Sequence, residues 1–379
     1  MRKRPIILYL DTSDFYELYK EDVREDLVSL KQYLIERVQS GDVAIGYSYP
    51  IIFEVLQNSD EKHRDDRLKR ARFLRLICGE NAHPHPVDLQ KGHRFPNQGV
   101  WMPHDTANVF SPTNLRRILN KQQKQIATER ENLSRAQRRS AQSRRGLRKL
   151  LQKSPRLTIQ KEKFQDIPVS DEFINSRYLE RYWSGEIAAT TVSHALKKWI
   201  SDPEIFFQMW YEYSGLKNPL LGLVTEKYNE ISEKLSKVIS AINNARDMYT
   251  NAKKSRAVYY DQLRAIELPS ELKSTLTLPK LPPFELTLPK VDWESIFGKD
   301  RGQHFTWYIE EVIAERHQPQ PSDLVDLLHL LYLKDVDLFR CDRKMSNLMI
   351  KMDKKNSEKI ISNRLEIRER IEQLMQSRP

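Results

Sequence analysis

Three carboxylates in the C-terminal part of the chain occupy positions that suit a metal site. Asp323 and Asp326 lie three residues apart, so a helix capped by Ser322 places both side chains on one face near its N-terminus. Asp342 follows the short apolar stretch Val336 to Arg340, which we expect to form a strand. Acids held close together repel one another unless a cation neutralises them, and oxygen ligands favour Mg²⁺ or Mn²⁺. We interpret these three acids as half of a metal site.

The other half of the site is expected near the N-terminus. The apolar run Pro5 to Leu10 has the length of a strand buried on both faces, and it ends at Asp11. Ligands of open α/β sheets bind at this carboxyl edge. A second expected strand, Val43 to Tyr47, leads into a helix that carries Glu54 among apolar neighbours. The alternative for each acid is a helix cap, a turn or a surface position, and it is weakest for Asp11 and Asp342, because strand-end acids have no expected capping role.

One histidine accompanies the C-terminal acids. His329 lies nearly two turns after Asp323 on the same expected helix, on or near the face of the two acids. It either contacts a leaving group or is a hydrogen-bonded core residue. Four more histidines fall in the aperiodic segment Gly79 to Pro112. The spacing of these histidines matches no zinc pattern. A metal role, a substrate-lining loop and an ordinary surface loop stay open for this segment.

Amphipathic helices are expected around these strands. Asp14 to Gln39 has the pattern of one helix or two, and Glu61 to Cys78 has the pattern of another, with Arg67 on its outer face. The last segment, Lys354 to Ser377, is predicted to be a single charged helix.

The order of these features resembles the PIN-like nuclease family. The resemblance rests on LDTSDF near the N-terminus, on an acid in the helix after the second strand, and on a D-x-x-D-x-x-H helix followed by a strand and CDR. It covers roughly residues 1–80 and 303–350. It implies a three-layer α/β/α sandwich with a parallel sheet, and a cluster of acids that bind Mg²⁺ or Mn²⁺ and hydrolyse phosphodiester bonds, most often in RNA.

The resemblance assigns roles to particular residues. The strand-end acid is Asp11, the helix acid is Glu54, the acid at the helix N-terminus is Asp323, and the last strand-end acid is Asp342. Asp326 is an additional candidate. All five are thus predicted to be catalytic and metal-binding residues.

The chain departs from this compact family in its middle, because more than two hundred residues separate the two halves. We expect residues 1–110 to form the N-terminal half of the nuclease domain and residues 293–379 to form its C-terminal half with a terminal helix. Residues 111–292 are predicted to form an inserted helical domain. Within it, Asp171 to Leu220 is rich in aromatic residues, and we expect most of them to belong to a helical core.

The inserted part contains a strongly basic segment. Residues 114–153 carry 13 Lys and Arg against 2 Glu, a net charge of +11 that equals the net charge of the whole chain. The basic residues recur at helical spacing with few apolar residues, which disfavours a membrane-surface helix and favours nucleic-acid phosphate as the partner. A solvated helix is the alternative. The candidate nucleic-acid-binding residues are Arg116, Arg117, Lys121, Lys124, Arg135, Arg138, Arg139, Arg144, Arg145, Arg148 and Lys149.

A long helix is expected after the aromatic region. From Leu221 to Ala252 apolar residues alternate in steps of three and four, which is a heptad seam, and the seam breaks at Arg256. The simplest arrangement pairs this helix with the basic segment as an antiparallel arm. An intermolecular coiled coil is the alternative, through which the chain would form a homo-oligomer or bind a protein partner.

Composition indicates a folded, soluble chain. Hydrophobic residues make up 39% and charged residues 30% of it, and the mean hydropathy is −0.67. No stretch approaches a membrane span, and the apolar run after MRKRP is too short for a signal peptide. Cys78 and Cys341 lie in apolar segments, so we expect buried free thiols in a reducing, cytoplasmic environment.

The leading hypothesis from the sequence is a metal-dependent endoribonuclease. In this hypothesis the basic segment holds RNA and the acids cut it, in a toxin, a processing enzyme or a defence effector. A catalytically idle scaffold that binds nucleic acid or a protein is the alternative from another class. A structure-specific DNA nuclease would use the same acids, and only a comparison of substrates separates it from a ribonuclease.

Overall fold

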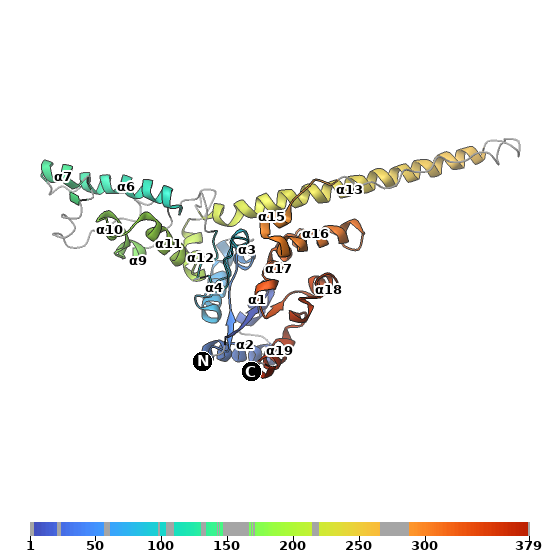
Figure 1. Ribbon diagram of the computed structural model, residues 1–379, viewed down its shortest axis with the longest axis horizontal. Helices are drawn as coiled ribbons and strands as arrows, with labels where there is room; N and C mark the ends of the chain where they lie inside the picture. Colours follow the sequence, from blue (N-terminus) through green and yellow to red (C-terminus); the bar gives the residue numbers. More distant parts are fainter. Residues whose placement is uncertain are drawn as a thin grey trace.

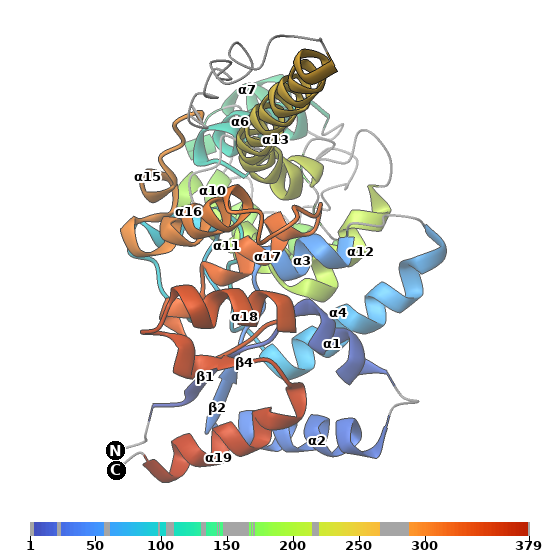
Figure 2. The same cartoon turned by 90° about the vertical axis from the view of Figure 1, so that its right-hand side faces the viewer.

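A four-stranded, all-parallel sheet joins the two ends of the chain in the computed structural model (Figures 1 and 2). Its strands are β1 (Ile6–Tyr9), β2 (Val43–Ile45), β3 (Leu338–Arg340) and β4 (Ile360–Ile361), in the order β2-β1-β3-β4. The structure describes residues 4–20, 24–56, 61–97, 99–103, 110–129, 134–141, 143, 145–146, 167, 169, 171–213, 220–265 and 288–377. The fold is a mostly helical α/β fold with a parallel sheet and one long helix, as predicted.

The register of the sheet explains how the two halves meet. Ile6 pairs with Val43, and Tyr9 pairs with Phe339, a residue 330 positions later in the chain. The side chains of β1 and β3 are buried with the exception of the half-buried Ile7. Because all four strands are parallel, their carboxyl ends lie at one edge of the sheet. The residues that follow β1 and β3 are therefore brought together, as the sequence predicted.

The fourth strand corrects one prediction. We expected one helix over Lys354 to Ser377, but Ile360–Ile361 forms β4 beside β3, and the helix α19 begins only at Ile367. Both isoleucines of β4 are buried. A strand of two residues is too short to show an alternating pattern, so its sequence does not differ from that of a helix.

Helices surround the sheet on several sides. In Figure 2 the strands lie between α18 above and the pair α2 and α19 below, with α1 and α4 beside them. The first predicted helical stretch is a pair of helices rather than one. The helices of this part are α1 (Thr12–Tyr19), α2 (Glu25–Ser40), α3 (Tyr49–Leu56), α4 (Arg64–Cys78), α5 (Pro86–Leu89), α15 (Trp293–Phe297), α16 (Lys299–Ile313), α17 (Asp323–Leu330), α18 (Arg343–Met352) and α19 (Ile367–Ser377).

The inserted helices pack on one side of this body (Figure 1). They are α6 (Pro112–Glu129), α7 (Arg135–Ala141), α9 (Asp171–Asn175), α10 (Tyr178–Trp183), α11 (Ala189–Ile200) and α12 (Pro203–Glu212). Most of their aromatic side chains are buried, as expected, and Trp183 Nε1 donates a 3.0 Å hydrogen bond to the Leu119 carbonyl. Arg67 of α4 is also buried, contrary to prediction, because α12 covers it and Tyr211 accepts a 2.7 Å hydrogen bond from it.

The long helix α13 (Leu221–Ala265) spans 45 residues without a break at Arg256. Of the seam residues, Ile231 and Ile242 are buried where α13 packs on α16, whereas Tyr249 and Ala252 further along the helix are exposed. The predicted antiparallel pairing with the basic segment is wrong, since α6 and α13 extend in opposite directions from the body (Figure 1). A heptad seam indicates that the helix packs against another element, but it does not identify that element.

Two further expectations about the chain are met in the described residues. Cys78 and Cys341 are both buried and free. None of the helices that the structure describes combines the length and the apolar character that a bilayer crossing requires.

Candidate metal centre

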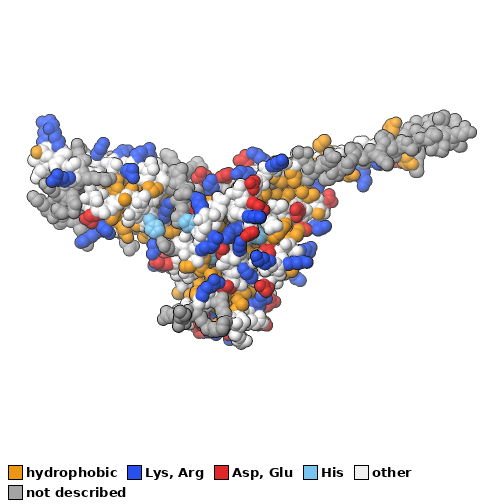
Figure 3. All heavy atoms as spheres, viewed as in Figure 1, with side chains coloured by type: hydrophobic (Ala, Val, Ile, Leu, Met, Phe, Trp, Pro, Cys, Tyr) orange, Lys and Arg blue, Asp and Glu red, His pale blue; other side chains and the backbone are white. Residues whose placement is uncertain are grey.

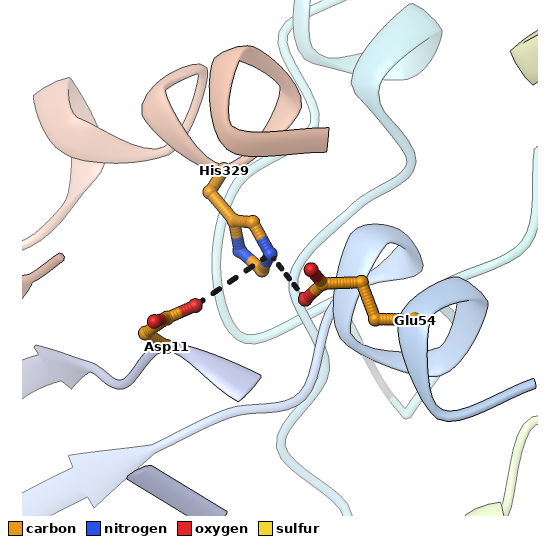
Figure 4. Close-up of side chains that lie close together, drawn as sticks. All are labelled: Asp11, Glu54 and His329. Atoms are coloured by element: carbon orange, nitrogen blue, oxygen red, sulfur yellow. Dashed lines mark hydrogen bonds and ion pairs between the residues drawn. The ribbon is translucent and has the colours of Figure 1, made fainter. Parts of the chain in front are cut away.

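Asp11, Glu54 and His329 meet at the carboxyl edge of the sheet (Figure 4). Asp11 directly follows β1, Glu54 belongs to α3, and His329 belongs to α17. His329 Nε2 lies 2.9 Å from Glu54 Oε2 and 3.9 Å from Asp11 Oδ1. One ligand atom from each of the three residues lies within 4.8 Å of the others. The three side chains could therefore hold a metal ion.

Asp11 has a structural role as well, which the sequence did not lead us to expect. It is the N-cap of α1, and its Oδ1 accepts a 2.8 Å hydrogen bond from the Thr12 amide. The Asp14 side chain completes a capping box by accepting a 3.1 Å hydrogen bond from the Asp11 amide. Each carboxylate oxygen has two lone pairs, so a cap leaves room for a metal bond. The sharp change from strand to helix thus fixes the position of the Asp11 carboxylate.

Glu54 is held toward the other two residues by hydrogen bonds. It is half-buried on an otherwise buried helix, and it accepts hydrogen bonds from Thr12 Oγ1 and His329 Nε2. Burial raises the pKa of Glu54, but the charge of His329 and the hydrogen bonds from His329 and Thr12 outweigh it, so the pKa lies below its usual value. Glu54 is therefore ionised and available as a metal ligand near neutral pH.

His329 is oriented by a buried network that begins on β1. Its Nδ1 lies 2.7 Å from the Tyr9 hydroxyl, which lies 2.8 Å from Ser48 Oγ. With a metal ion bound, Nδ1 would carry the only ring proton and donate it to Tyr9, and Nε2 would give up its proton to bind the ion, as in many metal sites. Burial lowers the pKa of His329, but the charge of Glu54 and its hydrogen bond raise it more, and the pKa lies above its usual value.

Asp326 and Asp342 lie next to this group without belonging to it. Burial raises the pKa of Asp326 to about 7, the charge of His329 opposes this, and the charges of Asp342, Glu54 and Asp11 add to it. Asp342 is exposed and caps α18, where its Oδ1 accepts a 2.6 Å hydrogen bond from the Met345 amide. Like Asp11, this strand-end acid has a capping role that the sequence analysis did not anticipate.

Asp323 is engaged elsewhere. The residue is 1% exposed, and Oδ2 accepts hydrogen bonds from the Tyr308 hydroxyl at 2.8 Å, His317 Nε2 at 2.7 Å and the Gln320 amide at 2.8 Å. Lys344 Nζ lies 3.2 Å from Oδ1. Burial raises its pKa, but these hydrogen bonds, that of His317 first, hold the pKa below its usual range. The acid therefore ties the segment before α17 to α16 and α18.

The structure thus joins two of the five predicted acids to a residue outside that set. His329 was considered as a leaving-group contact or a core residue, not as a ligand. The signal for a third role was its position three residues after Asp326, which places these two residues on one helix face. The Ser322 side chain makes no capping hydrogen bond, so the predicted cap of α17 is absent.

The candidate nucleic-acid-binding residues that the structure describes are all exposed. Arg116, Arg117, Lys121 and Lys124 lie on α6, Arg135, Arg138 and Arg139 lie on α7, and Arg145 follows α7. Figure 3 shows Lys and Arg side chains over the end of the molecule that carries these helices. Arg144, Arg148 and Lys149 lie outside the described residues.

Comparison of the chain with protein-family models, with curated proteins and with solved structures finds no match. What is shown is an α/β protein with a four-stranded parallel sheet and an acidic group that could hold a metal ion. The resemblance to PIN-like nucleases accordingly rests on the residues alone.

Proposed function

We propose that this chain is a PIN-like, divalent-metal-dependent endoribonuclease that hydrolyses RNA phosphodiester bonds. One observation carries the proposal: Asp11, Glu54 and His329 converge at the carboxyl edge of a parallel sheet from three separate elements. That edge is where open α/β folds bind ligands, and carboxylates with an imidazole are a donor set that suits a divalent ion. No side-chain nucleophile is needed for metal-assisted hydrolysis.

The residues fit a metal ion in their chemistry. Asp11 and Glu54 would supply carboxylate oxygens, and His329 would supply Nε2 while its Nδ1–H donates to Tyr9. When bound, such an ion lowers the pKa of a coordinated water and neutralises charge on the phosphate. Asp326, with a pKa of about 7, can hold or release a proton beside the site at neutral pH. Because the set includes an imidazole, we expect Mn²⁺ to be preferred over Mg²⁺.

The proposed partner is RNA, held by the basic helices of the insertion. Where the burial of α6 and α7 is described, their exposed positions carry Arg, Lys and other polar or small residues and not the bulky apolar face that a membrane-surface helix needs. Guanidinium groups bind phosphate well. We place the activity in the cytoplasm, because two buried free thiols are typical of a reducing compartment.

The deciding experiment measures cleavage of labelled RNA and DNA with Mn²⁺, with Mg²⁺ and with EDTA. Asp11→Asn is the informative variant, because asparagine also caps helices and so preserves the fold while weakening the metal site. Asp171→Asn, an exposed acid of α9, is the matched control. Metal-dependent RNA cleavage that is lost in Asp11→Asn alone would support the proposal, and unchanged cleavage by that variant would refute it.

A scaffold without catalysis is the second candidate. The observation in its favour is the 2.9 Å contact between His329 and Glu54, because this ion pair satisfies both side chains with no metal ion. In that case neither RNA nor DNA would be cut with any metal, while salt-sensitive binding of RNA would persist. Cleavage of structured DNA in preference to RNA would instead identify a DNA nuclease.

A further inference from the structure

A pocket of about 560 Å³ lies at the same edge of the sheet as the metal centre. It is bounded by the start of α2, the end of β3 with the start of α18, and the segment after β4. Four arginines line it together with polar side chains: Arg24, Arg340, Arg343, Arg364, Ser362 and Asn363. This composition is that of a site for an anion with several oxygen atoms.

The charges of the pocket do not cancel. Arg24 forms an ion pair with Asp26, and the buried Asp14 faces both Arg340 and Arg364, with Oδ1 lying 3.4 Å from one Nε and 2.9 Å from the other. Those two carboxylates balance two of the four guanidinium charges. Among the described residues no ion pair is formed by Arg343. Two positive charges are therefore left, which matches a phosphate monoester, whereas a phosphodiester carries one negative charge.

Arg340 gives the clearest sign of a missing partner. The residue is 8% exposed, and its Nε and Nη1 form no hydrogen bond with any described residue, although Nε is close to Asp14. A buried guanidinium with two nitrogen atoms left without hydrogen bonds is unfavourable, and a phosphate group, whose oxygen pairs match the guanidinium fork, is its natural partner. Because Arg340 lines the pocket, the partner would lie in the pocket.

The pocket is connected to the metal centre through one side chain. Asp14 accepts from Arg364 Nε with Oδ1, and it accepts from the Asp11 amide with Oδ2 at 3.1 Å. A nucleic-acid strand whose end lies among the arginines would therefore continue directly past Asp11. We propose that this arginine pocket binds the terminal phosphate of an oligonucleotide strand. The inference rests on the proposed nuclease function for the neighbouring centre, but binding in the pocket needs no metal.

The test uses the full-length chain in EDTA, so that no strand is cut. Binding is measured for oligoribonucleotides of one sequence with a 5′-phosphate, with a 3′-phosphate, or with hydroxyl groups at both ends. We expect one of the phosphorylated forms to bind about tenfold more tightly than the hydroxyl form, since each charge-assisted hydrogen bond contributes an effect of this order. Which end is preferred gives the direction of the strand across the centre.

Two variants and a control assign the effect to the pocket. Arg343→Gln changes an exposed residue and leaves the fold intact, and Arg340→Gln removes the buried guanidinium. Both should abolish the preference for a terminal phosphate. Arg177→Gln, which removes an exposed arginine next to α10, should keep it. Thermal unfolding of each variant verifies that it is folded.

The outcomes separate the pocket from the nuclease. Equal binding of the three oligonucleotides, or a preference that survives Arg343→Gln, overturns the inference. A preference that depends on Arg343 in a chain that cuts nothing with any metal would support the pocket and refute the nuclease. Cleavage of RNA by a chain with no preference for a terminal phosphate would refute the pocket alone.

Discussion

The Tyr9 hydroxyl lies 2.7 Å from Nδ1 of His329, although 320 residues separate them in the sequence. The same hydroxyl lies 2.8 Å from Ser48 Oγ, so a single phenol on β1 links α17 to the loop before α3. This places the ring of His329 between Asp11 and Glu54. The geometry of the candidate centre therefore depends on a buried residue that no ligand would touch.

Removal of this hydroxyl should weaken metal binding. Tyr9→Phe keeps the ring stacked on those of Phe339 and Tyr332, with centroid distances of 4.9 Å and 5.3 Å, but His329 loses the hydroxyl that orients it. We expect Mn²⁺ affinity to fall by about tenfold or more, as for other outer-sphere partners of metal-bound histidine. Calorimetric titration with Mn²⁺ measures this directly.

The matched control for this change is Tyr332→Phe. The Tyr332 hydroxyl donates to the Pro84 carbonyl at 3.0 Å, so its loss removes a buried hydrogen bond elsewhere. We expect Tyr332→Phe to lower the free energy of unfolding by about 1–3 kcal/mol and to leave Mn²⁺ affinity unchanged. If the two variants bound Mn²⁺ equally well, Tyr9 would have no orienting role.

Asp323 should prove more important for stability than Asp11. Four donors surround its buried carboxylate, and Asp323→Asn replaces an ionised acceptor by an amide that cannot accept from all of them. We expect a loss of about 2–4 kcal/mol in the free energy of unfolding by urea. Asp11→Asn should cost less than about 1 kcal/mol, because asparagine keeps the cap of α1. Similar stabilities of the two variants would contradict these roles.

Much of the sheet and part of the site could be predicted from the sequence. Apolar runs that end in an acid identified β1 and β3, and with them the position of Asp11. Glu54 was recognisable as an acid on an apolar helix. The role of His329 was not, because helix spacing gives the face of a residue but not the direction of its ring, which Tyr9 decides.

The errors have a common physical origin in partners that are distant in the chain. Arg67 has the sequence environment of an exposed residue and is buried only because α12 packs over it. The seam of α13 was real, yet it meets α16 instead of α6. The two capping acids, Asp11 and Asp342, were judged by the strand before them, whereas the helix that follows each one determines its hydrogen bonds.

Stability should fall in acid partly because of His83. This buried residue stacks on Phe95 at 4.5 Å, and neither ring nitrogen hydrogen-bonds to a described residue. Burial lowers its pKa from 6.5 to about 3, so below pH 6.5 the unfolded chain binds a proton that the folded chain does not. Proton binding to the unfolded chain therefore costs no stability above pH 6.5, and it lowers the free energy of unfolding progressively as the pH falls from 6.5 toward 3.

The size of this effect can be measured by urea unfolding at a series of pH values. Each unit of pH in this window costs about 1.4 kcal/mol, so His83 should account for about 2–3 kcal/mol between pH 6.5 and roughly 4.5. His83→Leu should flatten the pH dependence by that amount. His194→Leu, the same change at an exposed position, should leave the slope as it is. An unchanged slope in His83→Leu would show that burial does not lower the pKa of this histidine in the folded chain.

The basic face of α6 should determine how RNA binding responds to salt. Arg116, Arg117 and Lys121 are exposed there, and each phosphate contact on a single strand contributes about 0.7 to the slope of log K against log salt. Changing all three to Gln should weaken binding and reduce the slope by about 2. The control changes Lys237, Lys253 and Lys254 of α13 to Gln, which removes the same charge from the opposite side of the molecule. If both triple variants lose affinity equally, net charge and not the face of α6 governs binding; if only the α6 variant does, RNA lies along α6.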